Sequence, residues 1–425
     1  MSSRESYDTV ISVNNKRDAA IDLIIAALLA LSPILQHYIG LYQNAGVTAL
    51  LICVPILLVK ICLRGHISLS RSVYVLPLII FELYKAFDHG ISFGAAAHAI
   101  IILILFLAAA NACVDLGAVL RISSLIAEAA CVLIIVQYIC YYILGFHLQL
   151  VSVPLLLPSS GQWFDGVRTG LISVSGTANG FYRPSAFFLE PSHFFLYVIP
   201  HLALTLMSEG GDRRNKLAGA ILLTVGLLFS TSGMGIGCAG LIWVVYLLLY
   251  SKEEDRFTIR SLASFKTVFW VVTGLCCAVI AYLKVPFIRS TVQRIFVGDQ
   301  YGNTAISGRV RQSGNLLAQI GGRELIFGVS KDLSNITYNL SGFANTMYQY
   351  GIIGIVLSYF IYVRGVLFQR RQYRMLALIV LIVSFFSAHT HGTFYMCYYV
   401  MILLEGFLRE RQGLFGDCAR GSTSA

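Results

Sequence analysis

The sequence predicts an all-α, polytopic membrane protein with about 12 transmembrane helices. Of its 425 residues, 57% are hydrophobic and only 12% are charged, whereas soluble domains have about 45–50% apolar and about 25% charged residues. Apolar runs recur along the chain, and a bilayer crossing needs about 20 such residues. Because lipid offers no partner for an open strand edge, continuous backbone at that depth is helical. This composition excludes a soluble enzyme and a disordered chain.

The expected spans follow the apolar runs in order along the chain. Eight runs are long enough to cross a bilayer, and four more are shorter or more polar. The eight longer runs lie near 18–37, 45–63, 91–113, 125–147, 216–232, 234–250, 267–286 and 342–363, and the others near 72–87, 190–208, 375–389 and 391–408. Together they predict a single integral membrane domain over residues 1–425.

The basic residues predict the orientation, because Lys and Arg accumulate in the short cytoplasmic loops of membrane proteins. With the N-terminus inside, 21 of the 31 basic residues fall on the cytoplasmic side and 10 stay outside. We therefore expect both termini in the cytoplasm, with an uncleaved first span that begins at Ala19. The net charge of +10 does not indicate nucleic-acid binding, because the basic residues are spread between apolar runs instead of forming one patch.

Two longer outer segments, 148–190 and 284–341, hold nine of the ten outer basic residues, and seven of these nine are arginines. Solvated loops with scattered charges are one interpretation. The other is a ligand surface, since the planar guanidinium fork suits phosphate. Apolar residues at helical spacing in the second segment also predict short helices lying on the membrane surface, one from Ile288 to Phe296 and a second with Val310, Leu317 and Ile320. An anionic, lipid-linked ligand would suit a basic surface at that level.

Polar side chains recur at helical spacing where the sixth span begins. The phrase R-P-S-A-F-F-L-E-P-S-H occupies 183–193, and Glu190, His193, Tyr197 and His201 are spaced to share one helix face. Polar groups inside a bilayer are functional candidates. For Tyr197 and His201 a hydrogen-bonded seam between helices is an equal alternative. For Glu190, at the outer edge of the span beside Arg183, a functional role is favoured.

Two further polar groups lie near the C-terminus. The last outer turn, S-A-H-T-H-G-T-F-Y at 387–395, offers His391 as a general base near neutral pH. Its H-x-H pattern lacks an evident third ligand, so we expect no metal site there. Asn345 and Tyr348 form another polar face at the start of the tenth span. No D-x-D occurs in the sequence, which argues against a metal-held nucleotide-sugar.

The order of several short motifs resembles the Wzy-type family of bacterial O-antigen, capsule and exopolysaccharide polymerases, which are related to the O-antigen ligases. The resemblance covers roughly residues 180–400, and the first five spans match only in hydropathy. It lies in five phrases, which are R-P-S-A-F-F-L-E-P-S-H-F at 183–194, F-S-T-S-G-M-G at 229–235, S-G-R at 307–309, I-F-G-V-S at 326–330 and N-T-M-Y-Q-Y-G-I-I-G at 345–354.

The resemblance implies a membrane glycosyltransferase at the outer face of the inner membrane, which extends a glycan carried on undecaprenyl pyrophosphate. Arg183 and Arg309 best match the residues that stabilise the departing pyrophosphate, and Arg311 matches less well. Glu190 or His391 would be the base. The substrate site would also include His193, Asn345 and Tyr348. One departure is that Phe343 and Ala344 precede Asn345, where many relatives carry a histidine.

Neither a cofactor nor a metal is expected for this chemistry, because arginines can supply the positive charge. The expected partners are the undecaprenyl-pyrophosphate-linked oligosaccharide, membrane lipid and, from the resemblance, a chain-length regulator. Two alternatives share the architecture. One is an O-antigen-type ligase, which differs in its acceptor. The other is a lipid-linked oligosaccharide flippase or transporter, although the internal repeats common in such carriers are not evident between the two halves of the sequence.

Overall fold

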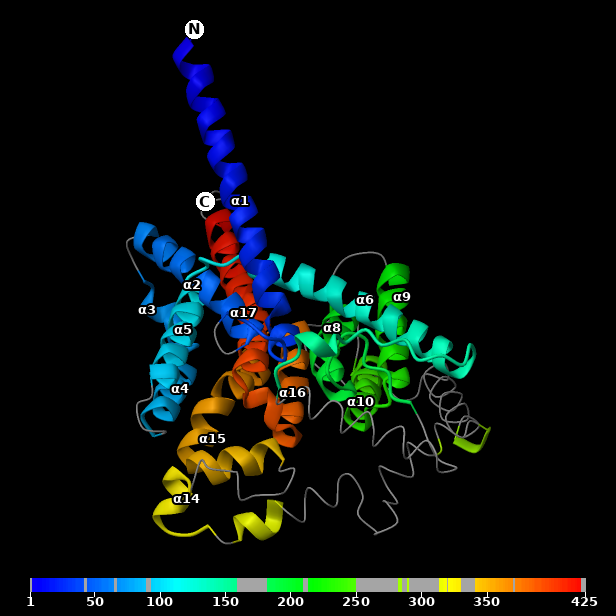
Figure 1. Cartoon of the computed structure of the whole chain (residues 1–425). Helices are drawn as coiled ribbons and strands as arrows, with labels where there is room; N and C mark the ends of the chain where they lie inside the picture. The colour runs from blue at the N-terminus through cyan, green and yellow to red at the C-terminus, as the bar shows by residue number, and fades with distance from the viewer. Residues whose placement is uncertain are drawn as a thin grey trace. The chain divides into compact units, whose positions relative to one another are not determined.

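The described residues of the computed structural model confirm an all-α fold (Figure 1). The chain divides into two compact units. Unit 1 comprises Met1–Ile126 and Met396–Ala425, and unit 2 comprises Ala127–Tyr395. Within the described residues, the regular structure is helical apart from isolated bridge residues, among them the bridge between Ile39 and Asn44. The described residues are 2–41, 44–64, 67–88, 93–158, 182–208, 213–249, 282–284, 289, 313–318, 320–329, 341–369 and 371–421.

Unit 1 is built from the N-terminal helices, and α2 packs against both α1 and α5, while α4 packs against α5. Lys60 on α2 forms an ion pair with Asp22 on α1, which ties the first two helices together across their apolar contact. The helices are α1 (Ser2–Leu35), α2 (Ala45–Arg64), α3 (Leu69–Ser72), α4 (Leu76–Asp88) and α5 (Phe93–Ala110). Two long helices, α6 (Leu116–Tyr142) and α17 (Thr393–Gly421), contribute to both units.

Unit 2 is organised around α8, which packs against α9, α10 and α16. Nearly every residue of α8 is buried, as expected of a helix that is apolar on all sides. Close approach of α10 depends on Gly235, since a Cβ there would lie 3.3 Å from the Phe195 ring. The helices are α8 (Pro191–Met207), α9 (Arg213–Phe229), α10 (Gly233–Leu249), α14 (Arg323–Phe327), α15 (Gly342–Phe368) and α16 (Arg371–Phe386), with the 3-10 helices η1 (Val153–Leu155) and η2 (Ala388–His391).

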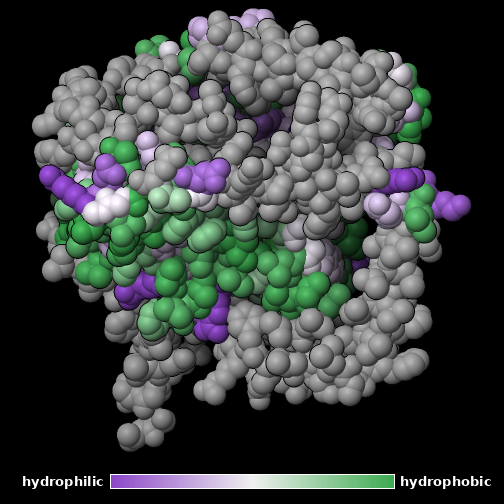
Figure 2. Space-filling model, turned by 90° about the horizontal axis from the view of Figure 1, so that it is seen from below, coloured by the Kyte–Doolittle hydropathy of each residue, from purple (hydrophilic) through white to green (hydrophobic). Residues whose placement is uncertain are grey.

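Three described helices are long and apolar enough to cross a membrane, namely those over Ala45–Leu63, Leu116–Tyr142 and Gly342–Phe368. Six shorter apolar helices accompany them. Large apolar side chains lie exposed on these helices, and apolar atoms dominate much of the described surface seen in Figure 2. Examples are Val59, Leu125 and Val356, each more than half exposed. Such outward apolar residues fit helices that face lipid, and together with the all-helical fold they fit an all-α membrane protein.

Helices lie at eleven of the twelve expected spans, and the remaining one, 267–286, falls outside the described residues apart from 282–284. Several of these helices are shorter than the length needed to cross a bilayer. The number of crossings, the cytoplasmic location of the termini and the single-domain organisation therefore stay predictions. The expected surface helix from Ile288 to Phe296 lies outside the described residues apart from Arg289, whereas residues 313–317, within the second expected stripe, are helical.

A break interrupts α15 at Gly351, whose φ of 61° and ψ of −160° are not helical. The neighbouring helix α14 packs against this break. A side chain at Gly351 would overlap the Ile326 carbonyl, and the backbone N–H of Val329 donates to the Tyr348 carbonyl at 2.8 Å. Only glycine combines that backbone conformation with such a close approach. The motifs at 326–330 and 345–354 therefore meet at this break.

Candidate functional site

The chain segment that enters α8 is held by a buried glutamine on α6. The Ala186 N–H donates to Gln137 Oε1 at 2.8 Å, and Gln137 Nε2 lies 3.4 Å from the Ala186 carbonyl and 3.0 Å from the Leu148 carbonyl. Gln137 is only 2% exposed, so its amide exchanges hydrogen bonds with backbone instead of water. The loop before α8 is thereby fixed to the last turns of α6.

A tyrosine pair fixes the start of the same segment. The Tyr182 N–H donates to the Tyr142 hydroxyl at 2.9 Å, and that hydroxyl lies 3.2 Å from the Tyr182 carbonyl. The Tyr182 ring packs on Tyr141 and meets the His147 ring edge-on. Burial raises the pKa of the Tyr182 hydroxyl further above its usual range. Arg183, the next residue, therefore projects from a well-anchored backbone.

Arg183 connects this segment to the junction between α9 and α10. Its Nε donates to Thr231 Oγ1 at 3.1 Å. The backbone at Thr231 has φ of 58°, and Ala186 has φ of 51°. Positive φ is an outlier for a β-branched residue, and such strain clusters at functional sites. The two motifs that contain these residues, at 183–194 and 229–235, are thus in direct contact through a guanidinium and a strained threonine.

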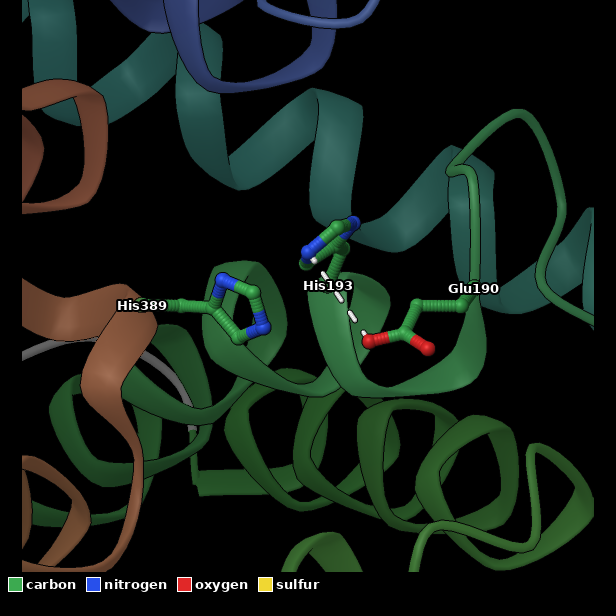
Figure 3. Close-up of side chains that lie close together, drawn as sticks. All are labelled: Glu190, His193 and His389. Carbon is green, nitrogen blue, oxygen red and sulfur yellow. Dashed lines mark ion pairs between the residues drawn. The ribbon is translucent and has the colours of Figure 1, made fainter. Parts of the chain in front are cut away.

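Glu190, His193 and His389 gather at the start of α8 (Figure 3). Glu190 is the N-cap residue with extended backbone, φ −149° and ψ 163°, and Pro191 begins the helix. The Glu190 carboxylate faces His193, with 3.8 Å between Oε1 and Nε2. The prediction that Glu190 and His193 lie on one helix face is wrong in one respect, because Glu190 is not in the helix. It precedes α8 with extended backbone, and its carboxylate faces the first helical turn.

His389 joins this cluster from η2. Its ring meets the His193 ring edge-on, with centroids 4.8 Å apart and planes at 87°. The Tyr395 hydroxyl donates to the His193 carbonyl at 2.9 Å, which fixes α8 against the first turn of α17, directly after η2. His193 is buried, the Glu190 side chain is 22% exposed and His389 is exposed. One side of the cluster is therefore rigid and dry, while the other is accessible to a ligand.

Of the remaining predicted residues, the structure describes the side chains of Asn345 and Tyr348. Asn345 and Tyr348 lie half-buried in the first turns of α15, and the Tyr348 carbonyl accepts from α14's flanking residue Val329. Arg309 and Arg311 lie outside the described residues. The backbone of His391 ends η2, but its side chain is outside the described part of the chain.

Three residues of the site were not predicted from the sequence. His389 belongs to the H-x-H pattern, which suggested metal binding but did not identify a third ligand. Thr231 lies in the small, Ser-rich junction motif, yet its contact with Arg183 depends on the packing of α9 and α10. Gln137 gave no signal, because a single glutamine in an apolar run is compatible with many roles.

No protein-family model matches the chain, and no curated protein matches it at a significant level.

Proposed function

We propose that this protein is a membrane glycosyltransferase that uses a glycan linked to a polyprenyl pyrophosphate as its donor. The observation that carries the proposal is the convergence of three motifs on the start of α8. Arg183 binds Thr231 of the junction motif, and His193 meets His389 of the last outer turn. Arg183 and Glu190 lie at the two ends of the short segment that enters α8, so an arginine and a carboxylate belong to the same candidate site.

Within this class, we propose a polysaccharide polymerase of the bacterial inner membrane. It would join undecaprenyl-pyrophosphate-linked repeat units into a long surface glycan at the outer face. The order of the motifs from 183–194 to 345–354 supports this choice. A chain-length regulator is the protein partner that this function implies. The broken helix α15 supports it further, since irregular backbone at membrane depth is tolerated where it is buried in protein or lines a cavity.

The chemistry needs an acceptor oxygen, a base and charge stabilisation. The acceptor hydroxyl attacks the anomeric carbon and loses its proton to Glu190 or His391, while the bond from the anomeric carbon to the pyrophosphate oxygen breaks. Arg183, together with Arg309, stabilises the negative charge on the departing pyrophosphate without a metal. Arg311, His193, Asn345 and Tyr348 would contact the pyrophosphate or the glycan. Because the donor is already activated by its glycosyl–pyrophosphate bond, which breaks in the transfer, no nucleotide or ion gradient is required.

The test is a reconstituted polymerisation assay with defined lipid-linked repeat units, run with and without chelator. We expect Arg183→Ala and Arg309→Ala to abolish long chains while single repeat units accumulate. Arg323→Ala is the matched control, because Arg323 lies in the second outer segment and its guanidinium packs over the Phe327 ring instead. Normal chain lengths in the Arg183→Ala and Arg309→Ala proteins would refute the role of these arginines.

The same assay separates the alternatives. Elongation without an added energy source excludes a pure flippase or transporter. A ligase is distinguished in cells, where deletion of the gene leaves finished polymer unattached on its lipid carrier. Loss of polymer with accumulation of single units supports the polymerase.

A further inference from the structure

We propose that Glu190, His193 and His389 bind a divalent transition-metal ion of the Zn²⁺ class. The three residues each offer one ligand atom, and these atoms all lie within 4.8 Å of one another. No pattern of neighbouring residues in the sequence predicts this set, since Glu190 and His193 belong to α8 and its N-cap while His389 belongs to η2. The metal proposal does not depend on the polymerase activity.

The donor set determines the kind of ion. Two imidazoles and one carboxylate form the ligand set of zinc sites that keep a fourth position open. Imidazole nitrogens favour Zn²⁺ and its neighbours over Mg²⁺ and Ca²⁺, which prefer all-oxygen shells. In this cluster two of the three donors are imidazoles, so a hard cation would be a poor match.

The cluster must contract before all three residues can reach one ion. Zinc binds nitrogen and oxygen ligands at about 2.0–2.2 Å, so two ligand atoms of a tetrahedral zinc ion lie about 3.4 Å apart. Glu190 Oε1 and His193 Nε2, 3.8 Å apart, are close to that separation. The limit of 4.8 Å for the whole cluster exceeds it by roughly 1.4 Å. The exposed His389 ring on its short 3-10 turn can supply that movement, while Tyr395 holds the backbone of His193 in place.

Two electrostatic features oppose each other at this position. The amino-terminal end of α8 carries partial positive charge, which disfavours a cation. The Glu190 carboxylate stands at the N-cap and offsets that charge. Arg183, the nearest basic residue along the chain, has its guanidinium Nε hydrogen-bonded to Thr231. The net result favours a cation that can take the carboxylate and both imidazoles together.

Exposure of His389 leaves room for a fourth ligand from solvent, so the ion is expected to exchange rather than to remain permanently bound. One consequence rests on the proposed function. If Glu190 is the base, a bound ion occupies the electron pair that the acceptor proton needs. Metal loading would then inhibit polymerisation, and chelator would relieve the inhibition.

The experiment uses the full-length protein in nanodiscs, stripped with chelator and titrated with Zn²⁺ by calorimetry and with Co²⁺ by visible absorption. We expect one ion per chain. We expect His193→Ala and His389→Ala each to weaken binding at least about 100-fold, because even loss of a supporting residue around a metal ligand weakens affinity about 10–100-fold. Glu190→Gln should weaken binding too. His37→Ala, a histidine of unit 1, is the matched control and should bind normally.

Several results would overturn the proposal. They are the absence of stoichiometric binding to the wild-type chain, equal affinity in the His193→Ala and wild-type proteins, or loss of binding in His391→Ala alone. Circular dichroism and size-exclusion profiles of each variant establish that it is folded. Binding is measured without substrate, so the metal proposal can fail while the polymerase holds, and an inactive protein that binds Zn²⁺ refutes only the polymerase.

Discussion

The two units of the chain use their acidic side chains differently. In unit 1, three acids among the described residues pair with permanently charged partners, in the pairs Asp22–Lys60, Glu82–Lys85 and Asp115–Arg121. In unit 2, Glu190 faces His193, and His389 completes the group. The difference is in the partner. Lysine and arginine keep their protons at neutral pH, whereas imidazole gains and loses one.

This comparison separates a structural role from a chemical one. The Glu82–Lys85 pair spans one helical turn, with 2.7 Å between Oε1 and Nζ, and it neutralises itself locally. The Glu190 cluster is assembled from two distant parts of the chain, and its partner groups are proton acceptors or metal ligands when neutral. We therefore expect substitutions in unit 1 to affect stability and those around α8 to affect activity.

The largest expected effect concerns the two glutamates. Glu190→Gln should lower the rate of polymerisation about 10²–10⁴-fold, the usual contribution of a general base. Glu82→Gln should leave the rate per folded molecule unchanged, because the Glu82 carboxylate pairs with Lys85 on its own helix. The measurement is the initial rate of chain growth in the reconstituted assay, normalised to the folded fraction by size exclusion.

Two results would break this comparison. Full activity in Glu190→Gln would mean that His391 is the general base, and the His391→Ala variant would then lose polymerisation activity instead. An equal loss of rate in the folded Glu82→Gln protein would mean that the unit 1 pair also takes part in the reaction. Either result would remove the proposed distinction between the units.

A smaller effect is expected at Thr231. Thr231→Val removes the hydroxyl that accepts from Arg183 Nε, and a hydrogen bond to a charged group contributes about 1.5–3 kcal/mol. Thr231 positions the arginine without contacting the reaction itself, so kcat/KM should fall about 10–100-fold. Because the arginine acts on the leaving group, most of the loss should appear in kcat.

Thr231→Ser is the matched control, since it keeps the hydroxyl and relieves β-branching at a positive φ. It should retain activity and at least wild-type stability. If Thr231→Val and Thr231→Ser behave alike, the hydrogen bond to Arg183 has no role in the reaction. A loss confined to KM would instead place Arg183 in ground-state binding of the donor.

The smallest effect is one of stability. Gln137→Leu leaves the Ala186 N–H buried without its acceptor, and we expect it to lower the free energy of unfolding by about 1–3 kcal/mol. Asp22→Asn in unit 1 should cost less than about 1 kcal/mol, because the Asp22–Lys60 pair is partly exposed. Thermal unfolding in detergent, followed by circular dichroism, measures both. A larger loss in Asp22→Asn than in Gln137→Leu would contradict this order.

Much of the helical fold was predictable from apolar runs, since each helix satisfies its own backbone and needs only local sequence to form. Helix ends were less predictable. Glu190 was assigned to the face of α8, but Pro191 begins the helix and leaves Glu190 as its N-cap. The break at Gly351 was also missed, because one glycine in an apolar run looks like ordinary helix packing.

The sequence by itself determined the class of fold and the short motifs, including the segment with Arg183, Glu190 and His193 that enters α8. Tertiary structure alone decided which of them meet. His389 reaches His193, and Thr231 reaches Arg183, because helices pack through apolar surfaces whose pairing a hydropathy pattern does not specify. The physical reason is the separation of the interacting residues along the sequence. A helix forms from local contacts, whereas a site built from distant segments depends on contacts that exist only once the helices have associated.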